Sequence, residues 1–116
     1  MSVSVEAALR RLTRIPGVVG AMVVDSEAGL PVASELAAGT GETALSALAG
    51  SLFSRTSDAS SASGFGRVRT LQVESREGHV IVSGGGPLLV VALAESAAQV
   101  GMIRVEATRV AGELSQ

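Results

Sequence analysis

IPGVVGAMVVDSEAGLPVAS, residues 15–34, contains the two strands that decide the fold. The apolar run predicts a strand over residues 18–25, and because it carries no polar side chain before its last residue, both of its faces must be covered. Residues 26–29 end in a glycine that can take a positive φ angle, which predicts a hairpin connection to a second strand over residues 30–35. Pro31 has no amide donor, so this second strand belongs at an edge of the sheet. The fold therefore needs helices on both sides of a sheet.

Helical spacing of apolar residues predicts three helices, over about residues 5–14, 42–62 and 100–114. The long middle helix is expected to begin after Thr40 as its N-cap, and the last helix after a capping box over residues 96–99. The residues of the middle helix that we expect to face the sheet form an apolar stripe: Leu45, Leu48, Leu52 and Phe53.

A meander of three further strands is predicted between the middle and last helices, over about residues 67–75, 79–83 and 88–94. The first of these is polar and belongs at the second edge of the sheet, whereas the last is apolar throughout and belongs at the centre. Because consecutive strands usually neighbour one another, the hairpin and the meander join through the first and fifth strands. The sequence predicts an α+β fold with a five-stranded antiparallel sheet in the order 2-1-5-4-3. The long helix covers one face, and the N- and C-terminal helices cover the other.

Composition excludes several classes of protein. A chain of 116 residues with 47% hydrophobic residues predicts one domain over residues 1–116. Its apolar runs are much shorter than the roughly 20 residues that cross a bilayer, and its N-terminus lacks the apolar segment of a secretory signal. We therefore expect a cytoplasmic protein without membrane contact. The absence of cysteine excludes disulfides and thiolate metal sites, and a net charge of −2 with two aromatic residues argues against binding to nucleic acid.

Three polar groups could suggest catalytic or ligand sites, but each has a better structural explanation. Residues 83–87, SGGGP, lack the Gly-Lys-Ser/Thr of a phosphate loop and lead into a strand, so we expect a turn. His79 has no second ligand or orienting partner at a useful spacing and is expected at the surface or at a strand end. Asp25 and Glu27 suit local hydrogen bonds in the hairpin turn. We expect no catalytic residue, no metal and no cofactor.

The predicted order of helices and strands, together with three segments of sequence, is similar to the roadblock/dynein light chain family and especially to its small bacterial members. The segments are IPGVVGAMVVDSEAGLPVAS at 15–34, RVRTLQVE at 67–74 and VGMIRVEATRVAGEL at 100–114. This resemblance implies a homodimer or heterodimer that extends one sheet across both chains. It also implies binding to a Ras-like small GTPase, in bacteria the Mgl-type polarity GTPase, and stimulation of its GTP hydrolysis without an enzyme active site.

The middle helix also carries small residues on the side opposite the leucine stripe. They recur at spacings of three and four and are Ala44, Ala47, Ser51, Ser54 and Asp58. The residues alone leave open a solvated face or a close helix-to-helix contact, and the family resemblance favours the dimer contact. The edge strand with Arg67, Arg69 and Leu71 is either protected by its charges or paired with its copy in a partner, which would give a ten-stranded sheet.

Some alternatives stay open. Arg55, the only basic residue of the middle helix, could serve as an arginine finger, although an ion pair with Asp58 is favoured. Arg10, Arg11 and Arg14 form a charged face that is more readily solvated than a site for phosphate or an acidic partner. Instead of a GTPase regulator, the chain could be a structural adaptor without effect on nucleotide turnover. A profilin-like module with a ligand pocket between sheet and helix is less favoured, because aromatic residues are scarce.

Overall fold

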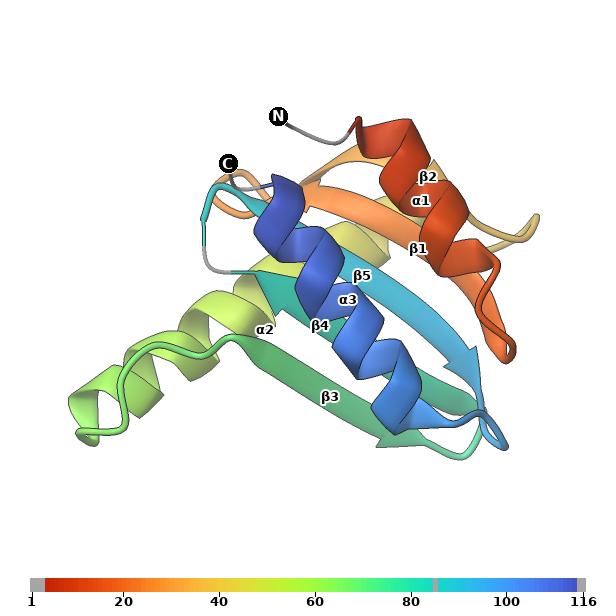
Figure 1. Ribbon diagram of the computed structural model, residues 1–116. Coiled ribbons are helices and arrows are strands. Elements are labelled where there is room, and N and C mark those ends of the chain that lie inside the picture. Colours follow the sequence, from red (N-terminus) through yellow and green to blue (C-terminus); the bar gives the residue numbers. More distant parts are fainter. Residues whose placement is uncertain (1–3, 85, 115–116) are drawn as a thin grey trace.

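A computed structural model describes residues 4–84 and 86–114 of the chain. The helices and strands follow the predicted order and lie in layers (Figure 1). Their bounds are α1 Val5–Thr13, β1 Val18–Asp25, β2 Leu30–Glu35, α2 Glu42–Ala62, β3 Thr70–Ser75, β4 Gly78–Gly84, β5 Leu88–Glu95 and α3 Val100–Leu114. None of these helices is both long and apolar enough to cross a bilayer.

The strands form one antiparallel sheet in the order β2-β1-β5-β4-β3, as predicted. The central strands β1 and β5 are paired on both sides, and their side chains point alternately into the two buried clusters on the faces of the sheet, which explains why neither carries polar side chains in its middle. Pro31 lies in the edge strand β2, opposite Val24, where the register shifts. The other edge strand, β3, begins at Thr70 and not at residue 67. The amide of Val68 donates instead to Ser57 Oγ of α2, at 3.1 Å, whereas the carbonyl of Arg69 accepts from the Gly84 amide of β4, at 3.0 Å, so Val68 is held by the helix and bonding to the sheet begins at Arg69.

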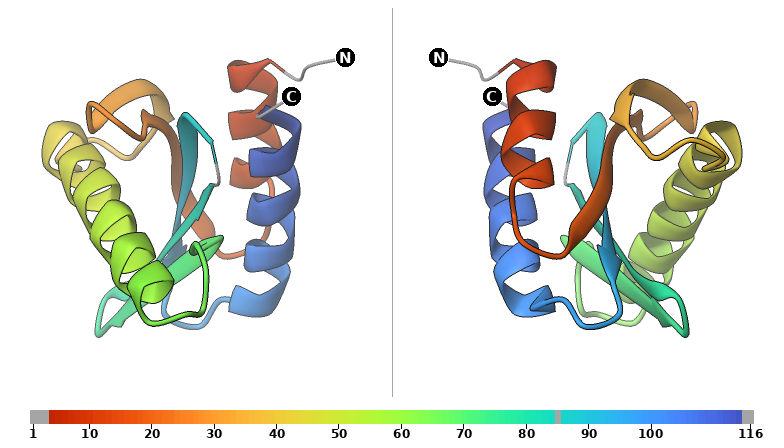
Figure 2. Two further views of the ribbon diagram at one scale, coloured as in Figure 1. Left: turned by 90° about the vertical axis from the view of Figure 1, so that its left-hand side faces the viewer. Right: turned by 90° about the vertical axis from the view of Figure 1, so that its right-hand side faces the viewer.

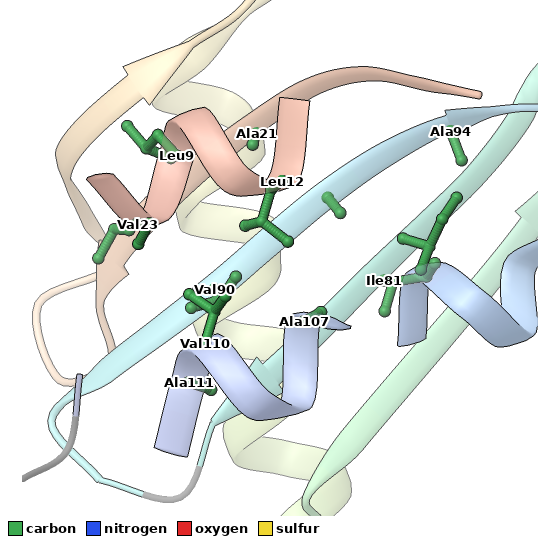
Figure 3. Close-up of a cluster of buried hydrophobic side chains, with 13 residues drawn as sticks. Leu9, Leu12, Ala21, Val23, Ile81, Val90, Ala94, Ala107, Val110 and Ala111 are labelled. Carbon is green, nitrogen blue, oxygen red and sulfur yellow. The ribbon is translucent and has the colours of Figure 1, made fainter. Parts of the chain in front are cut away.

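Helices cover both faces of the sheet in the predicted arrangement, with α1 and α3 on one face and α2 on the other (Figure 2). The alternation of a strand divides the core in two: Ala21 and Val23 pack toward α1 and α3, and Met22 packs toward α2. Figure 3 shows the first of these clusters, in which Leu12 of α1 and Val110 of α3 meet the sheet. The sheet therefore has a separate hydrophobic core on each of its two faces.

The predicted bounds of α2 and α3 are confirmed, but their predicted N-terminal caps are wrong. The N-cap of α2 is Gly41, without a side-chain hydrogen bond, and the amide of Thr40 donates to the Ala37 carbonyl at 3.1 Å. Thr40 therefore belongs to the preceding turn. Likewise α3 begins at Val100, and residues 96–99 link β5 to α3 in a turn with its own backbone hydrogen bond. In both places the chain completes a turn before the helix begins, which a capping pattern by itself does not reveal.

The side of α2 that faces the sheet also differs from the predicted stripe. Its buried residues are Ser46, Ala49, Gly50, Phe53 and Ser57. Phe53 was expected there, but Leu48 is 58% exposed, and Leu45 and Leu52 are half-buried. The reason is the close approach of α2 to the β1–β2 turn, where a Cβ atom at Gly50 would lie 3.2 Å from the Cα atom of Gly29. Small side chains, not leucines, allow that approach.

The two predicted turns are confirmed. Asp25 Oδ1 accepts hydrogen bonds from two backbone amides of the β1–β2 turn, including that of Glu27 at 3.0 Å. Residues 83–87 connect β4 to β5, although Gly85 lies outside the described residues. Both segments therefore use their polar or glycine residues to reverse the chain.

His79 lies at the start of β4, as expected for a strand-end residue, but it does not lie at the surface. It is 9% exposed, and its Nε2 atom lies 3.3 Å from the carbonyl oxygen of Ser96. Its Nδ1 atom is buried and has no hydrogen-bond partner among the described residues. The turn between β5 and α3 covers the ring, and this contact between segments distant in sequence leaves no local sequence signal.

Candidate partner-binding surface

One side of α2 faces away from the sheet (Figure 2). We call it the outer face of α2, and its predicted small residues are all exposed: Ala44, Ala47, Ser51, Ser54 and Asp58. Arg55 is exposed on the same face. Small side chains allow the surface of another protein to come close to the helix backbone. The structure therefore brings these predicted residues together on one accessible surface.

A neighbouring side of α2 is apolar and was expected to face the sheet. Leu45, Leu48 and Leu52 are spaced by three and four residues and so lie along one side of the helix, here called the leucine flank. Leu45 packs against the core cluster on this face, whereas Leu48 is 58% exposed. Periodicity alone could not predict how α2 is rotated about its own axis. The buried residues have the same helical spacing as the leucines, so either set could have faced the sheet.

The β3 side of the same sheet face is also uncovered. In crossing the sheet, α2 contacts chiefly β1 and β2. Val73 of β3 is 39% exposed and pairs with Val80, which packs against the core cluster on the α2 side. Because cross-strand partners share a face, Val73 lies on the same side of the sheet as α2. The leucine flank and the α2 side of β3 therefore present exposed apolar groups on the same face of the molecule.

The outer edge of β3 pairs with no other strand in the described part of the chain. Leu71 lies in this strand and is half-buried on the α2 side, opposite Val82. Arg67 and Arg69 are exposed but precede the strand, so their charges oppose pairing with another chain only at the beginning of β3. The free backbone groups of an edge strand are a template for pairing with another chain.

An exposed aromatic residue lies near the C-terminal end of α2 and was not singled out from the sequence. Phe65 is 87% exposed and is flanked by Gly64 and Gly66, whose φ angles are +85° and +84°. Those positive angles turn the loop back from α2 toward β3. The sequence signal was present in the pattern Gly-Phe-Gly, because an aromatic side chain between two glycines has few neighbours to bury it.

The predicted ion pair between Arg55 and Asp58 is wrong. Both side chains are exposed, and no ion pair joins them in the described structure. In water the Coulomb attraction of such a pair barely exceeds the entropy cost of holding two long side chains together. Arg55 is therefore available to a partner on the outer face of α2.

Arg11 was predicted to be solvated with Arg10 and Arg14, but it connects α1 to α3. Its guanidinium bonds to Glu106 at 2.7 Å and also to Glu113. The hydrogen bonds that Arg11 donates to Glu113 and to Glu106 raise the pKa of Arg11 above its ordinary value. Arg10 and Arg14 are exposed, as expected.

A hollow of about 220 Å³ lies between α2 and the turns that follow β1 and β4. Its polar lining includes Ser57, Asp58 and Arg67. A second hollow of about 380 Å³ adjoins it and shares Ser26 and Gly50. Small or polar residues make up most of the lining of both hollows, whereas small-molecule pockets are lined mainly by large apolar and aromatic side chains, so they lend little support to a ligand-sensing module. Within residues 4–84 and 86–114, no group of three or more histidine, aspartate and glutamate residues could hold a metal ion.

Comparisons with known proteins agree with this fold. The sequence model of the Roadblock/LC7 domain matches residues 4–94. The uncharacterised protein MJ0714 of Methanocaldococcus jannaschii is 27% identical over 110 residues, which cover 95% of this chain and 92% of that protein. Among solved structures, a Roadblock/LC7 domain from Streptomyces avermitilis has a TM-score of 0.85 at 21% identity and covers 97% of this chain and 96% of its own. Myxococcus xanthus MglB has a TM-score of 0.83 at 17% identity, with 94% and 89% covered.

These structural matches show a common fold, and the family match extends over most of the chain, from the start of α1 to β5. The matched range includes the hairpin of β1 and β2, one of the three segments on which the predicted resemblance depended. The protein therefore belongs to the Roadblock/LC7 family.

Proposed function

We propose that this protein forms a homodimer through α2 and β3, and that the dimer binds a Ras-like small GTPase and stimulates its GTP hydrolysis. The observation that carries the proposal is the exposure of Leu48 on α2 and Val73 on β3, on the same face as an unpaired strand edge. Large apolar groups next to free backbone donors and acceptors are what a second protein chain covers. The family resemblance supplies the class of partner.

The dimer contact is assigned to the leucine flank and to β3. Pairing of β3 with its copy around a two-fold axis satisfies the free backbone groups of both strands. The same axis brings the leucine flank of each protomer toward the uncovered side of the partner's sheet, where Val73 lies. Burial of these apolar groups then drives association.

In this proposal the outer face of α2 stays accessible in the dimer and binds the GTPase. Two such faces, side by side in a dimer, make a flat platform of small side chains with Arg55 and Asp58 on each helix. A switch region that docks there is held in its hydrolysis-competent conformation if the platform binds that conformation more tightly. In this mechanism the regulator contributes binding energy and no reacting group, and Arg55 acts as a contact residue.

The test combines light scattering of the purified protein with GTP turnover by the Ras-like GTPase encoded nearest to its gene. We expect a dimer at micromolar concentration and faster turnover when the protein is added. A monomer would overturn the platform. A dimer that binds the GTPase but leaves its turnover unchanged would establish the structural adaptor instead.

A further inference from the structure

The face opposite α2 carries a second exposed apolar surface. Met102 and Val105 of α3 are 56% and 59% exposed. Together with Ile15 and Pro16, which follow α1, they line two adjoining hollows beside α1 and α3. Isolated exposed apolar side chains are common on proteins, but Met102 lines both hollows. These four residues therefore form a continuous surface, here called the α1/α3 strip.

The residues of the strip are not part of the hydrophobic core beneath it. Ile103, Ala107 and Val110 are fully buried and form the side of α3 that packs on the sheet. Met102 and Val105 lie on the other side of the helix, where folding gains little from an apolar side chain. Methionine is common at protein-binding surfaces, because its flexible side chain adapts to different partners.

Arginines border the strip. Arg14 is exposed and takes part in no ion pair of the described residues. Arg109, whose side chain is 60% exposed, lies 3.3 Å from Glu106, but the other carboxylate oxygen of Glu106 is already bonded to Arg11. Arg11 is also bonded to Glu113, so Glu106 and Glu113 together balance Arg11 and Arg109, and Arg14 is the arginine of this lining without an ion pair among the described residues.

The charged residues of the whole chain are also unevenly distributed between the α1/α3 side and the remainder of the molecule. Residues 4–14 and α3 hold five arginines and three glutamates, whereas the rest of the chain holds four arginines and eight acidic residues. An acidic partner is therefore attracted to the α1/α3 side and repelled by the remainder of the molecule.

We propose that the α1/α3 strip is a docking site for an acidic amphipathic helix of another protein, separate from the α2 surface. Along α3 the strip is about one helical turn long, from Met102 to Val105, and Ala98 in the turn before the helix lines the same hollow as Met102. Such a strip suits two apolar anchors of a helix, at positions i and i+3 or i+4, while carboxylates beside them pair with Arg14 and Arg109. The inference does not rest on the proposed GTPase function.

The chemistry favours a protein segment over a membrane surface. Recognition of anionic lipids typically uses about four to eight clustered basic residues, whereas this strip is bordered by Arg14, Arg109 and the Arg11 that is bonded to Glu106 and Glu113. Aromatic anchors of the membrane interface are also missing here, because the only aromatic residues of the chain are Phe53 and Phe65. Specific contacts to a helix need only a few charges at matched positions.

The test selects displayed random peptides of about 16 residues, long enough for four helical turns, on the immobilised full-length protein. Peptides that also bind the double variant Met102→Glu/Val105→Glu are removed first. We expect enriched sequences to be acidic and to carry apolar residues at helical spacing. A synthetic enriched peptide should then perturb the backbone amide resonances of Ile15 and residues 98–109 on titration.

Charge variants of equal size supply the control. Arg14→Glu/Arg109→Glu should weaken binding of that peptide at least tenfold, and added salt should weaken it in the wild type. Arg69→Glu/Arg76→Glu changes the net charge equally, at exposed positions outside the strip and outside α1 and α3, and should leave binding within about threefold. Equal losses in both variants, enrichment of basic peptides, or no enrichment would overturn the proposal. The proposal would also be overturned if no peptide is enriched and the protein instead binds phosphatidylcholine–phosphatidylserine vesicles through the strip. In that case Met102→Glu/Val105→Glu would abolish the binding to vesicles.

Discussion

The substitution Leu48→Ala measures how much of the dimer depends on the leucine flank. In the single chain Leu48 is 58% exposed, so its replacement leaves no cavity and should change the stability of the fold by less than about 0.5 kcal/mol. In the proposed dimer the same side chain is covered by the partner. The substitution should therefore separate association from folding.

The magnitude follows from the exposed fraction. Full burial of a leucine side chain stabilises by about 1.5–3 kcal/mol. The 58% that Leu48 leaves exposed corresponds to about 1–1.7 kcal/mol in each protomer. A symmetric dimer loses the contact twice, about 2–3 kcal/mol in total, which raises the dimer Kd roughly 30- to 150-fold.

Sedimentation velocity over a dilution series measures that Kd. Leu30→Ala is the matched control, because Leu30 is 56% exposed but lies on β2, at the opposite edge of the sheet. It removes the same amount of exposed apolar surface and should change the Kd less than about twofold. Circular dichroism on each variant checks that the fold is retained.

A second variant decides between the two sides of α2. Ser51→Glu introduces a charge on the outer face, so it should impair binding of the GTPase and leave the dimer intact. If Ser51→Glu dissociates the dimer while Leu48→Ala does not, the small residues form the dimer contact and our assignment of the leucine flank is refuted. Equal effects of Leu48→Ala and Leu30→Ala would refute it as well.

Further predictions concern the core, one turn and the regulatory mechanism. Ile103→Ala, at a position with no exposed surface, should lower the free energy of unfolding by about 2–5 kcal/mol in urea denaturation, since α3 would lose its contact with the sheet. Gly78→Ala should lower it by about 2–4 kcal/mol, because at a φ of +152° the new Cβ atom would lie 2.2 Å from the Ala94 carbonyl oxygen. Gly39→Ala, where φ is +88° but the space is open, should cost only about 1–2 kcal/mol from the backbone angle, and equal losses at both sites would contradict the steric argument. Arg55→Ala should leave saturated GTP turnover unchanged while weakening GTPase binding; loss of turnover with binding intact would establish an arginine finger.

The central strands and the sheet order could be predicted because their signals are local and strong. An apolar run such as residues 18–24 has to be buried on both sides, and Pro31 cannot donate a hydrogen bond to a neighbouring strand. Short connections then left one economical way to join the hairpin to the meander. The candidate surface was partly predictable as well, since helical spacing correctly placed Ala44 and Ser51 on one exposed face.

Other features depended on contacts between distant segments. His79 is buried because the turn at Ser96 lies over it, and Arg11 is held by carboxylates of α3 that lie about ninety residues or more further along the chain. The β3 strand is shorter than predicted because the Val68 amide bonds to α2. None of these partners is near in sequence, so no local pattern could indicate them.

The sequence by itself determined which segments are strands or helices and how the strands are ordered, because hydrophobic periodicity and the missing proline amide act within single segments. Only the tertiary structure decided how α2 is rotated. Its leucines and its small residues repeat at the same spacing, so either set could have faced the sheet. The close approach of Gly50 to Gly29 leaves no room for a larger side chain, and this contact turns Leu48 outward, where a partner can cover it.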